Sequence, residues 1–357
     1  MLLDDGASKH RPSIVPCPCW STQLIVESLR RPPKPSTLNL MSSLTLRASL
    51  LFATLLTAPA QAQSLRIALA KQPFSPTGTS VGPTTMANGG VQELLAKMGA
   101  TVRLAESKLT ADQSTEYGAW KKLGWALGDF ARIVAQNERD GFFTVGLYAT
   151  CPSMPGMVAG LQHAGADGKP LRIGMLWLDA HPDFNTPETT RSGSMGGMPV
   201  AIATGRALQN LRLDATLDPP LRDEDVVMAG VRLTDPLEQD LLDHSKIQQL
   251  SVSDVQKITP AVWAQLDRLN AQVDKLYIHI DMDVLDPREV SMHGNKVPGG
   301  PSSEELAKLF QQIFSRYPKA TAIGFATIPP SDPGGLSIAA LNRMVVGAVE
   351  GVKARQR

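Results

Sequence analysis

A cluster of metal-binding residue types follows a short apolar run in the middle of the chain. The cluster reads Asp179-Ala-His181-Pro-Asp183, and the apolar run before it covers residues 173–178. Side chains of an extended chain alternate with a period of two, so Asp179, His181 and Asp183 can share one side. By itself, the cluster could also be a helix N-cap or a solvated loop.

A second acidic cluster lies about a hundred residues later. It reads Asp281-Met-Asp283 and follows the apolar run 275–279. Carboxylates brought together repel one another unless cations lie among them. Carboxylates with imidazole suit a borderline-to-hard divalent ion, and bridging carboxylates suit a pair of such ions ~3.5–4 Å apart. The two clusters together therefore predict a site for two divalent metal ions.

The elements around these clusters alternate between strand and helix signals. Near-continuous apolar runs between amphipathic helices favour a parallel sheet covered on both faces, and a βα barrel remains an alternative. In either fold, ligands bind at the carboxyl ends of the strands, where both clusters lie. Strands are expected at residues 65–70, 101–104, 142–147, 173–178, 225–229, 275–281 and 320–325, and helices at 91–98, 118–136, 236–243, 303–314 and 338–349.

Composition excludes several classes of protein. The net charge of +1 lacks the excess of Lys and Arg that nucleic-acid binding requires. A hydrophobic content of 43% is too high for a disordered chain of 357 residues. Three cysteines, two of them at Cys17 and Cys19, do not make a disulfide scaffold.

The first sixty residues do not resemble part of the folded domain. Residues 1–40 are rich in Pro, Ser and basic residues, and they are a disordered extension or result from a mis-annotated start. Residues 41–62 have the features of a signal peptide: one positive charge, an apolar run and small residues around Ala60. The run is shorter than the ~20 residues that span a membrane. We expect a periplasmic or secreted protein without a membrane span, cytoplasmic if this segment is not processed, with one domain over residues 64–357.

Both clusters resemble the metal motifs of the ureohydrolase (arginase/agmatinase) superfamily. The first continues through Asn185-Thr-Pro-Glu-Thr and Ser192-Gly, and the second reads His279-Ile-Asp-Met-Asp-Val-Leu-Asp-Pro. Gly230-Val-Arg with Asp235-Pro and Glu238 resembles the substrate-side loop, and Pro298-Gly-Gly resembles the segment after the second motif. The resemblance covers about residues 64–350 in the family's order.

The resemblance implies a three-layer α/β/α fold with a mainly parallel sheet of about eight strands. It also implies two manganese ions and a bridging hydroxide that attacks a guanidinium carbon and releases urea. Asp179 and Asp281 would bridge both ions, Asp183 would complete one, and His181 and Asp283 would complete the other. A homo-oligomer, often built from trimers, is also implied.

The resemblance further assigns the residues around the substrate. Glu305, the acid after the Gly-Gly turn, would pair with the guanidinium and act in catalysis with Asp183 and Asp283. The other end of the substrate would lie against the side chains of Asn185, Thr190, Ser192 and Asp235.

This chain departs from the family pattern at three positions. Cys151 replaces the histidine that supplies a further metal ligand, which favours Zn²⁺, Fe²⁺, Co²⁺ or Ni²⁺ relative to Mn²⁺; a cysteine that only fills space is the alternative. Gly196 replaces the histidine that shuttles protons, and Ser194 replaces an asparagine that faces the substrate carboxylate. His279 is expected to point away from the metals.

Three functions from different classes remain. The leading hypothesis is a metallohydrolase that cleaves a C–N bond of a guanidino or amidino compound. A catalytically weak or inactive relative that binds a guanidino ligand or a metal is the alternative, favoured by Cys151 and Gly196. A phosphatase that uses Asp281 and Asp283 is a third, although an isolated DxD pair is weak evidence.

Overall fold

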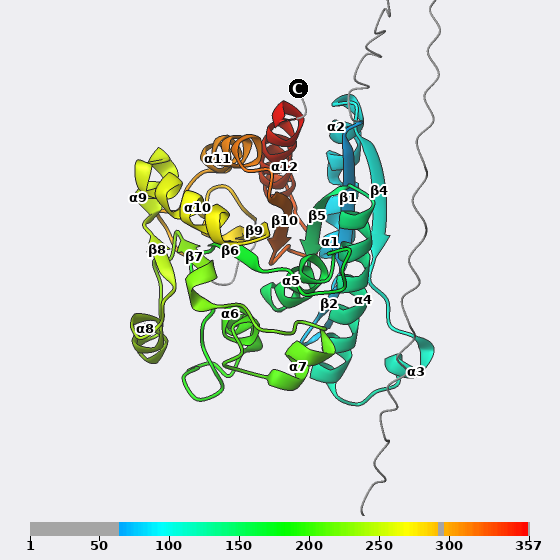
Figure 1. Cartoon of the computed structure of the whole chain (residues 1–357), viewed down its shortest axis with the longest axis vertical. Helices are drawn as coiled ribbons and strands as arrows, with labels where there is room; N and C mark the ends of the chain where they lie inside the picture. Colours follow the sequence, from blue (N-terminus) through cyan, green and yellow to red (C-terminus); the bar gives the residue numbers. More distant parts are fainter. Residues whose placement is uncertain (1–63, 292–295, 356–357) are drawn as a thin grey trace, which may run out of the picture. The chain divides into compact units, whose positions relative to one another are not determined.

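An eight-stranded parallel sheet forms the centre of the protein (Figure 1). The computed structural model describes residues 64–291 and 296–355. The predicted extension 1–40 and signal peptide 41–62 lie outside the described residues. In spatial order the strands are β4 (Thr101–Glu106), β1 (Arg66–Gln72), β5 (Phe143–Tyr148), β10 (Ala320–Ala326), β9 (Lys275–Asp281), β6 (Ile173–Leu178), β7 (Val226–Ala229) and β8 (Gln248–Leu250).

Helices cover the sheet on both faces. In chain order they are α1 (Gly82–Met86), α2 (Gln92–Lys97), α3 (Ala111–Ser114), α4 (Ala119–Arg139), α5 (Met154–Gln162), α6 (Pro199–Ala203), α7 (Gln209–Asp214), α8 (Pro236–Asp243), α9 (Val252–Lys257), α10 (Pro260–Gln272), α11 (Ser303–Arg316) and α12 (Leu336–Arg355). A two-stranded hairpin, β2 (Phe74–Ser75) and β3 (Gly78–Thr79), stands apart from the main sheet. None of the helices in the described residues is long and apolar enough to cross a membrane.

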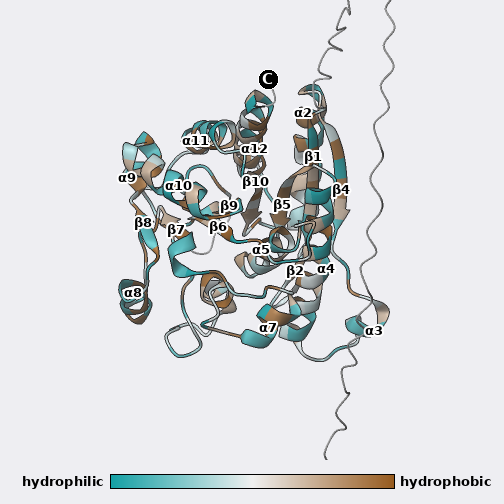
Figure 2. Cartoon of the chain, viewed as in Figure 1, coloured by the Kyte–Doolittle hydropathy of each residue, from teal (hydrophilic) through white to brown (hydrophobic). Residues whose placement is uncertain are grey.

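The sheet separates two hydrophobic cores, because successive side chains of each strand point to opposite faces. In β9, Leu276, Ile278 and Ile280 pack with α2 and α9 to α12, whereas Tyr277 packs with α4 to α7 on the other face. Because both faces are covered, central strands such as β6 are buried along their whole length. Figure 2 shows hydrophobic residues in the central strands and a mixture of hydrophobic and hydrophilic residues on the helices.

The expected three-layer fold is confirmed, and the barrel alternative is wrong. Strands β4 and β8 each pair with one neighbour, so the sheet has two open edges and does not close. Four adjacent strands, in the order β5, β10, β9, β6, have their carboxyl ends on the same side of the sheet. This carboxyl edge is distinct from the open edges formed by β4 and β8. The residues that follow or end these strands include Cys151, Thr327, Asp281 and Asp179. The topology therefore gathers chemically active side chains from four distant segments.

Candidate metal centre

Two groups of ligand atoms lie side by side at this edge. The first contains Cys151, Asp179 and Asp183, and the second contains Asp179, His181 and Asp283. Within each group the ligand atoms lie within 4.8 Å of one another. Asp179 belongs to both groups, Asp183 to the first, and His181 and Asp283 to the second, whereas Asp281, the other bridging residue that the resemblance implied, belongs to neither.

Hydrogen bonds and close contacts fix the acidic side chains of the loop after β6. Asp179 Oδ1 accepts a hydrogen bond of 2.7 Å from the backbone N–H of His181. Asp183 has a positive φ of 48°, a conformation that Asp adopts more readily than most residues. The Nδ1 atom of His181 lies 3.3 Å from Asp283 Oδ2 and 3.4 Å from Asp179 Oδ1. These contacts hold the side chains of the loop against the end of β9.

Asp281 is held by neighbours rather than included in either group. Its Oδ1 accepts from the backbone N–H of Asp283 at 2.9 Å. Its Oδ2 accepts from Cys151 Sγ at 2.9 Å and from the Thr327 hydroxyl at 2.5 Å. Asp281 therefore ties the ends of β9, β5 and β10 together.

The buried carboxylates repel one another and would be stabilised by a bound cation or by protonation. Burial, and then the charges of Asp283, Asp183 and Asp281, raise the pKa of Asp179 well above its ordinary value. Burial and the neighbouring carboxylates also raise the pKa of Asp183, and burial followed by Asp283 raises the pKa of Asp281 to about 7. Asp179 Oδ2 is buried and has no hydrogen-bond partner among the described residues. An unpartnered buried oxygen among carboxylates fits a bound cation, so the residues present suit the metals that the family implies.

The pKa shifts predict how the stability of the metal-free protein depends on pH. With a chelator present, the free energy of unfolding is expected to fall as pH rises from about 6.5 through the pKa of Asp281, about 7. The raised folded-state pKa values of Asp179, Asp183 and Asp281 mean that the folded protein binds more protons than the unfolded chain. One pKa unit corresponds to about 1.4 kcal/mol, so a fall of at least about 1 kcal/mol is expected.

Two histidines also contribute to the pH dependence of stability. The pKa of His181 is raised, because its contact with Asp283 outweighs the effect of burial, and its contribution is likewise lost as pH rises. Burial lowers the pKa of His279, so below about pH 6.5 protonation of this residue in the unfolded chain opposes the trend. Denaturant unfolding at several pH values, with chelator or with Mn²⁺, measures the effect. A stability that rises with pH in the chelated protein would contradict the assignment.

Four of the candidate ligands, Cys151, His181, Asp183 and Asp283, line a cavity of about 380 Å³. Of the predicted substrate-binding residues, Asn185, Ser192 and Asp235 line this cavity. Thr190 does not line it; its hydroxyl lies 3.3 Å from the Ser192 hydroxyl and accepts from the backbone N–H of Gly193. Gly196 lines the cavity and contributes no side chain. A cavity of this size with amide, hydroxyl and carboxylate groups suits a small polar molecule.

The structure does not bring Glu305 to this cavity. Glu305 Oε2 accepts from the backbone N–H of Ser302 at 2.7 Å and from its hydroxyl at 3.0 Å, while the backbone N–H of Glu305 donates to Ser302 Oγ. Ser302 and Glu305 thus form a capping box at the start of α11. Glu305 lines a separate hollow with Asp286 and Arg288. The expectation that it contacts the guanidinium is not met because the helix N-terminus holds its carboxylate.

The prediction for His279 is wrong. Its Nε2 atom lies 3.4 Å from Cys151 Sγ, and its ring stacks on Trp177 with 4.0 Å between the ring centroids. His279 stands two residues before Asp281 on β9, so the two side chains leave the strand on the same face. The contact with Cys151 follows from this register.

Thr327 is a residue of the site that the sequence analysis did not name, whereas Glu238 was named only as part of the substrate-side loop. Thr327 follows β10 directly, so the rule that ligands gather at strand ends could have found it. Glu238 is buried, accepts from the backbone N–H of Phe184 at 2.8 Å and lines the cavity. Its position three residues after Asp235, at the start of α8, is that of a capping-box residue.

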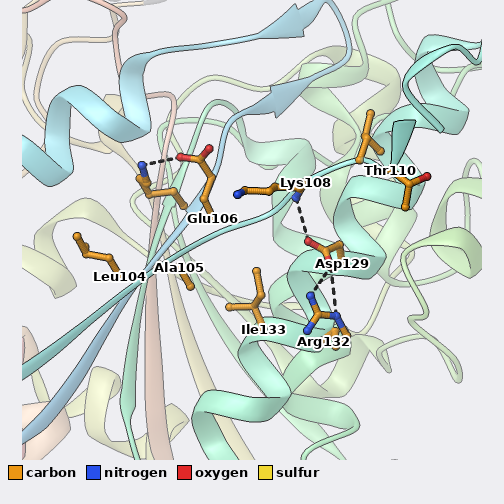
Figure 3. A pocket seen from close by; sticks show the side chains of 10 residues that line it. Leu104, Ala105, Glu106, Lys108, Thr110, Asp129, Arg132 and Ile133 are labelled. Carbon is orange, nitrogen blue, oxygen red and sulfur yellow. Dashed lines mark hydrogen bonds and ion pairs between the residues drawn. The ribbon is translucent and has the colours of Figure 1, made fainter. Parts of the chain in front are cut away.

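A second hollow, beside the edge strand β4, offers no comparable chemistry (Figure 3). Its carboxylates are already paired: Glu106 lies 2.5 Å from Lys71 Nζ, and Asp129 lies 2.6 Å from an Arg132 nitrogen. Asp129 also accepts from the backbone N–H of Lys108. Because Lys71 and Arg132 already neutralise these carboxylates, the hollow does not need a metal ion to balance its charge.

Comparison with known proteins agrees with the fold. The arginase family model matches residues 151–346. Arginase of Agrobacterium fabrum is 30% identical over 267 residues, which cover 72% of this chain and 80% of that protein. Among solved structures, arginase from Bacillus caldovelox aligns with a TM-score of 0.67 and 24% identity, over 80% of this chain and 98% of that chain. Agmatine ureohydrolase of Thermoplasma volcanium aligns with a TM-score of 0.57 and 17% identity, over 83% and 92% of the two chains. Since the family model matches more than half of the length of this chain, the chain belongs to the arginase family.

Proposed function

We propose that this protein is a metal-dependent hydrolase that cleaves a C–N bond of a guanidino or amidino compound and releases urea, as an arginase or agmatinase does. The observation that carries the proposal is the pair of three-residue ligand groups that share Asp179. These groups adjoin a cavity that contains Asn185, Ser192 and Asp235.

Divalent ions bound by the two groups would supply the nucleophile, because such ions lower the pKa of water toward ~7. The residues that would hold them are Asp179, shared by both groups, with Cys151 and Asp183 on one side and His181 and Asp283 on the other. The family favours manganese. A sulfur ligand at Cys151 shifts the preference of its group toward Zn²⁺, Fe²⁺, Co²⁺ or Ni²⁺.

The protein's own side chains would orient the substrate. Asn185 is fixed by the Thr189 hydroxyl, which donates to its Oδ1 at 2.9 Å, and lies 3.5 Å from Asp235 Oδ2. Asp235 offers a carboxylate to a cationic group of the substrate. Ser192 presents a hydroxyl that is placed by Thr190. Gly196 offers no proton to the leaving amine, so the amine must take its proton from another group or from solvent.

The place of action and the assembly are part of the same proposal. The signal-peptide features of residues 41–62 support action in the periplasm or outside the cell. Membership of the arginase family supports a homo-oligomer based on trimers.

Metal reconstitution with a panel of substrates tests the proposed activity. The purified full chain is treated with a chelator, reloaded with Mn²⁺, Co²⁺, Ni²⁺ or Zn²⁺, and incubated with arginine, agmatine and other guanidino compounds. We expect urea release with at least one pair of metal and substrate, and none in the chelated protein. Release of phosphate from an aryl phosphate instead would favour the phosphatase hypothesis.

Binding without turnover is the second candidate function. Two observations favour it: Gly196 leaves no proton shuttle, and Glu305 caps α11 instead of lining the cavity. Saturable binding of a guanidino compound, with no urea under any of the metals, would establish this function and exclude the hydrolase.

A further inference from the structure

A chain of buried polar side chains ends on the sulfur of Cys151. The Nε2 atom of His279 lies 3.4 Å from Cys151 Sγ, and its Nδ1 atom lies 2.8 Å from the Tyr277 hydroxyl. The Tyr277 hydroxyl lies 3.2 Å from the Tyr148 hydroxyl. The side chains of Tyr148, Tyr277 and His279 are all 0% exposed. Burying polar groups costs free energy that purely apolar side chains would avoid, so such a chain calls for an explanation.

Two glycines in the sheet leave space for these buried polar side chains. Tyr148 lies on β5 and Tyr277 on β9, and β10 runs between them. A Cβ atom at Gly324 of β10 would collide with both tyrosine hydroxyls, and one at Gly146 would collide with the Tyr148 hydroxyl. The two hydroxyls can therefore meet across β10 only because residues 146 and 324 are glycines.

Stacking fixes the plane of the His279 ring. The ring of Trp177, on the neighbouring strand β6, lies parallel to it within 3°, with 4.0 Å between the centroids. Tyr148 stacks on it at 6.1 Å with an angle of 14° between the planes. Stacking holds the ring in one plane, and the hydrogen bond between Nδ1 and the Tyr277 hydroxyl keeps Nε2 on the side of the Cys151 sulfur.

Only one direction of hydrogen bonding satisfies every group. The Cys151 thiol donates to Asp281 Oδ2, so the sulfur is free to accept from His279 Nε2–H. The Nδ1 atom then accepts from the Tyr277 hydroxyl, and the Tyr277 oxygen accepts from Tyr148. The reverse direction would leave the hydroxyl hydrogen of Tyr148 without an acceptor among the described residues. The chain thus delivers an N–H donor to the sulfur.

We propose that Tyr148, Tyr277 and His279 are positioning residues that hold Cys151 as a thiolate ligand of the metal site, a proposal that rests on the metal centre of the proposed function. To bind a metal ion, the Cys151 thiol would release its proton to solvent. Asp281 would then lose the hydrogen bond from Cys151, while the N–H of His279 would remain and stabilise the negative sulfur. Outer partners of this kind orient a ligand and tune its affinity for the metal.

A thiol nucleophile would need the opposite arrangement. In that role, His279 Nε2 must accept the thiol proton, which requires the hydrogen-bond direction that leaves Tyr148 unsatisfied. Cys151 is also only 2% exposed, and its burial and the three neighbouring buried carboxylates disfavour a free thiolate in the absence of a cation. Ligation of a metal removes this difficulty because the ion neutralises the cluster.

Cobalt substitution tests the proposal without depending on turnover. The purified full chain is loaded with Co²⁺, and the near-ultraviolet sulfur-to-cobalt charge-transfer absorption is recorded. We expect this band in the wild-type protein and its loss in Cys151→Ser. Tyr277→Phe, which removes one oxygen atom, is expected to weaken the binding of one of the two ions by about 10- to 100-fold and to shift the band. Tyr148→Phe, one step further from the sulfur, is expected to have a smaller effect.

Tyr317→Phe is the matched control, because Tyr317 is also buried and its hydroxyl bonds Asp267. We expect no change in cobalt binding for this variant. If Tyr277→Phe does not fold, the comparison of Tyr148→Phe with Tyr317→Phe decides. A cobalt-loaded protein without the band, or a Tyr277→Phe variant that matches the control, overturns the inference. The band and the Tyr277 effect in a protein that releases no urea would uphold the inference and refute the hydrolase, whereas absence of cobalt binding would refute both.

Discussion

Asp179→Asn is expected to abolish urea release, with a fall in kcat of at least about 10³-fold, the scale of losing a principal electrostatic group of an active site. Asp179 is the residue that both ligand groups share, so its loss removes a ligand from each. Elemental analysis is expected to find fewer than one ion per chain. Urea assays and metal content after reconstitution measure the two effects.

The same variant is expected to stabilise the chelated protein. Asp179 is fully buried, one of its oxygens has no partner among the described residues, and three other carboxylates lie nearby. A neutral amide relieves that repulsion, so the chelated variant at about pH 8 is expected to unfold at a higher denaturant concentration than the chelated wild type. Loss of activity with gain of stability separates a lost metal site from a damaged fold.

Glu106→Gln is a suitable control for Asp179→Asn. It also converts a carboxylate to an amide, but Glu106 pairs with Lys71 beside the edge strand β4. Activity and metal content are expected to stay at the wild-type level. Two tightly bound ions in Asp179→Asn would show that the shared carboxylate is not a ligand.

Gly196→His is expected to increase kcat by about 10²-fold if protonation of the leaving amine limits turnover, since general acid catalysis contributes ~10²–10⁴-fold. Gly196 lines the cavity, and a Cβ atom there would meet only the Ser194 hydroxyl, at 3.0 Å. That hydroxyl is the end of a short side chain at an exposed position. An imidazole can therefore enter the cavity without displacing the backbone.

The pH profile separates a proton donor from a simple change of shape. The histidine variant is expected to gain a titration step near the ordinary pKa of histidine, about 6.5, in its plot of kcat against pH. Gly196→Ala adds a side chain without an imidazole and is expected to show neither the step nor the increase. Equal rates for the two variants would show that the protonation of the amine does not limit this enzyme.

Local signals in the sequence were sufficient for much of the fold. Strands β6 and β9 were predicted because strands buried on both faces are apolar almost throughout. β8 was missed because it has three residues, two of them exposed glutamines. α5 was missed for the opposite reason: all nine of its residues are buried, so it has no polar face to reveal a helical period.

The acidic motifs were recognisable for a comparable reason. Asp179, His181 and Asp183 lie within five residues, and Asp281 and Asp283 lie within three, so short-range spacing places each set on one side of the chain. The capping box was also readable, since Ser302 stands three residues before Glu305. The family resemblance instead assigned Glu305 to the guanidinium of the substrate. The structure shows that the N-terminus of α11 binds its carboxylate.

What the sequence by itself determined is the content of the site: which carboxylates, which imidazole and which thiol are available, and that they stand at strand ends. What only the tertiary structure decided is which of them meet. The order β5, β10, β9, β6 places Cys151 beside His279 and Asp281, which are more than a hundred residues away in the chain. This pairing depends on strand order, and the contact between the Tyr148 and Tyr277 hydroxyls depends on the absence of a side chain at Gly324 of the intervening strand. Both are properties of packing between distant segments, which spacing along the chain does not encode.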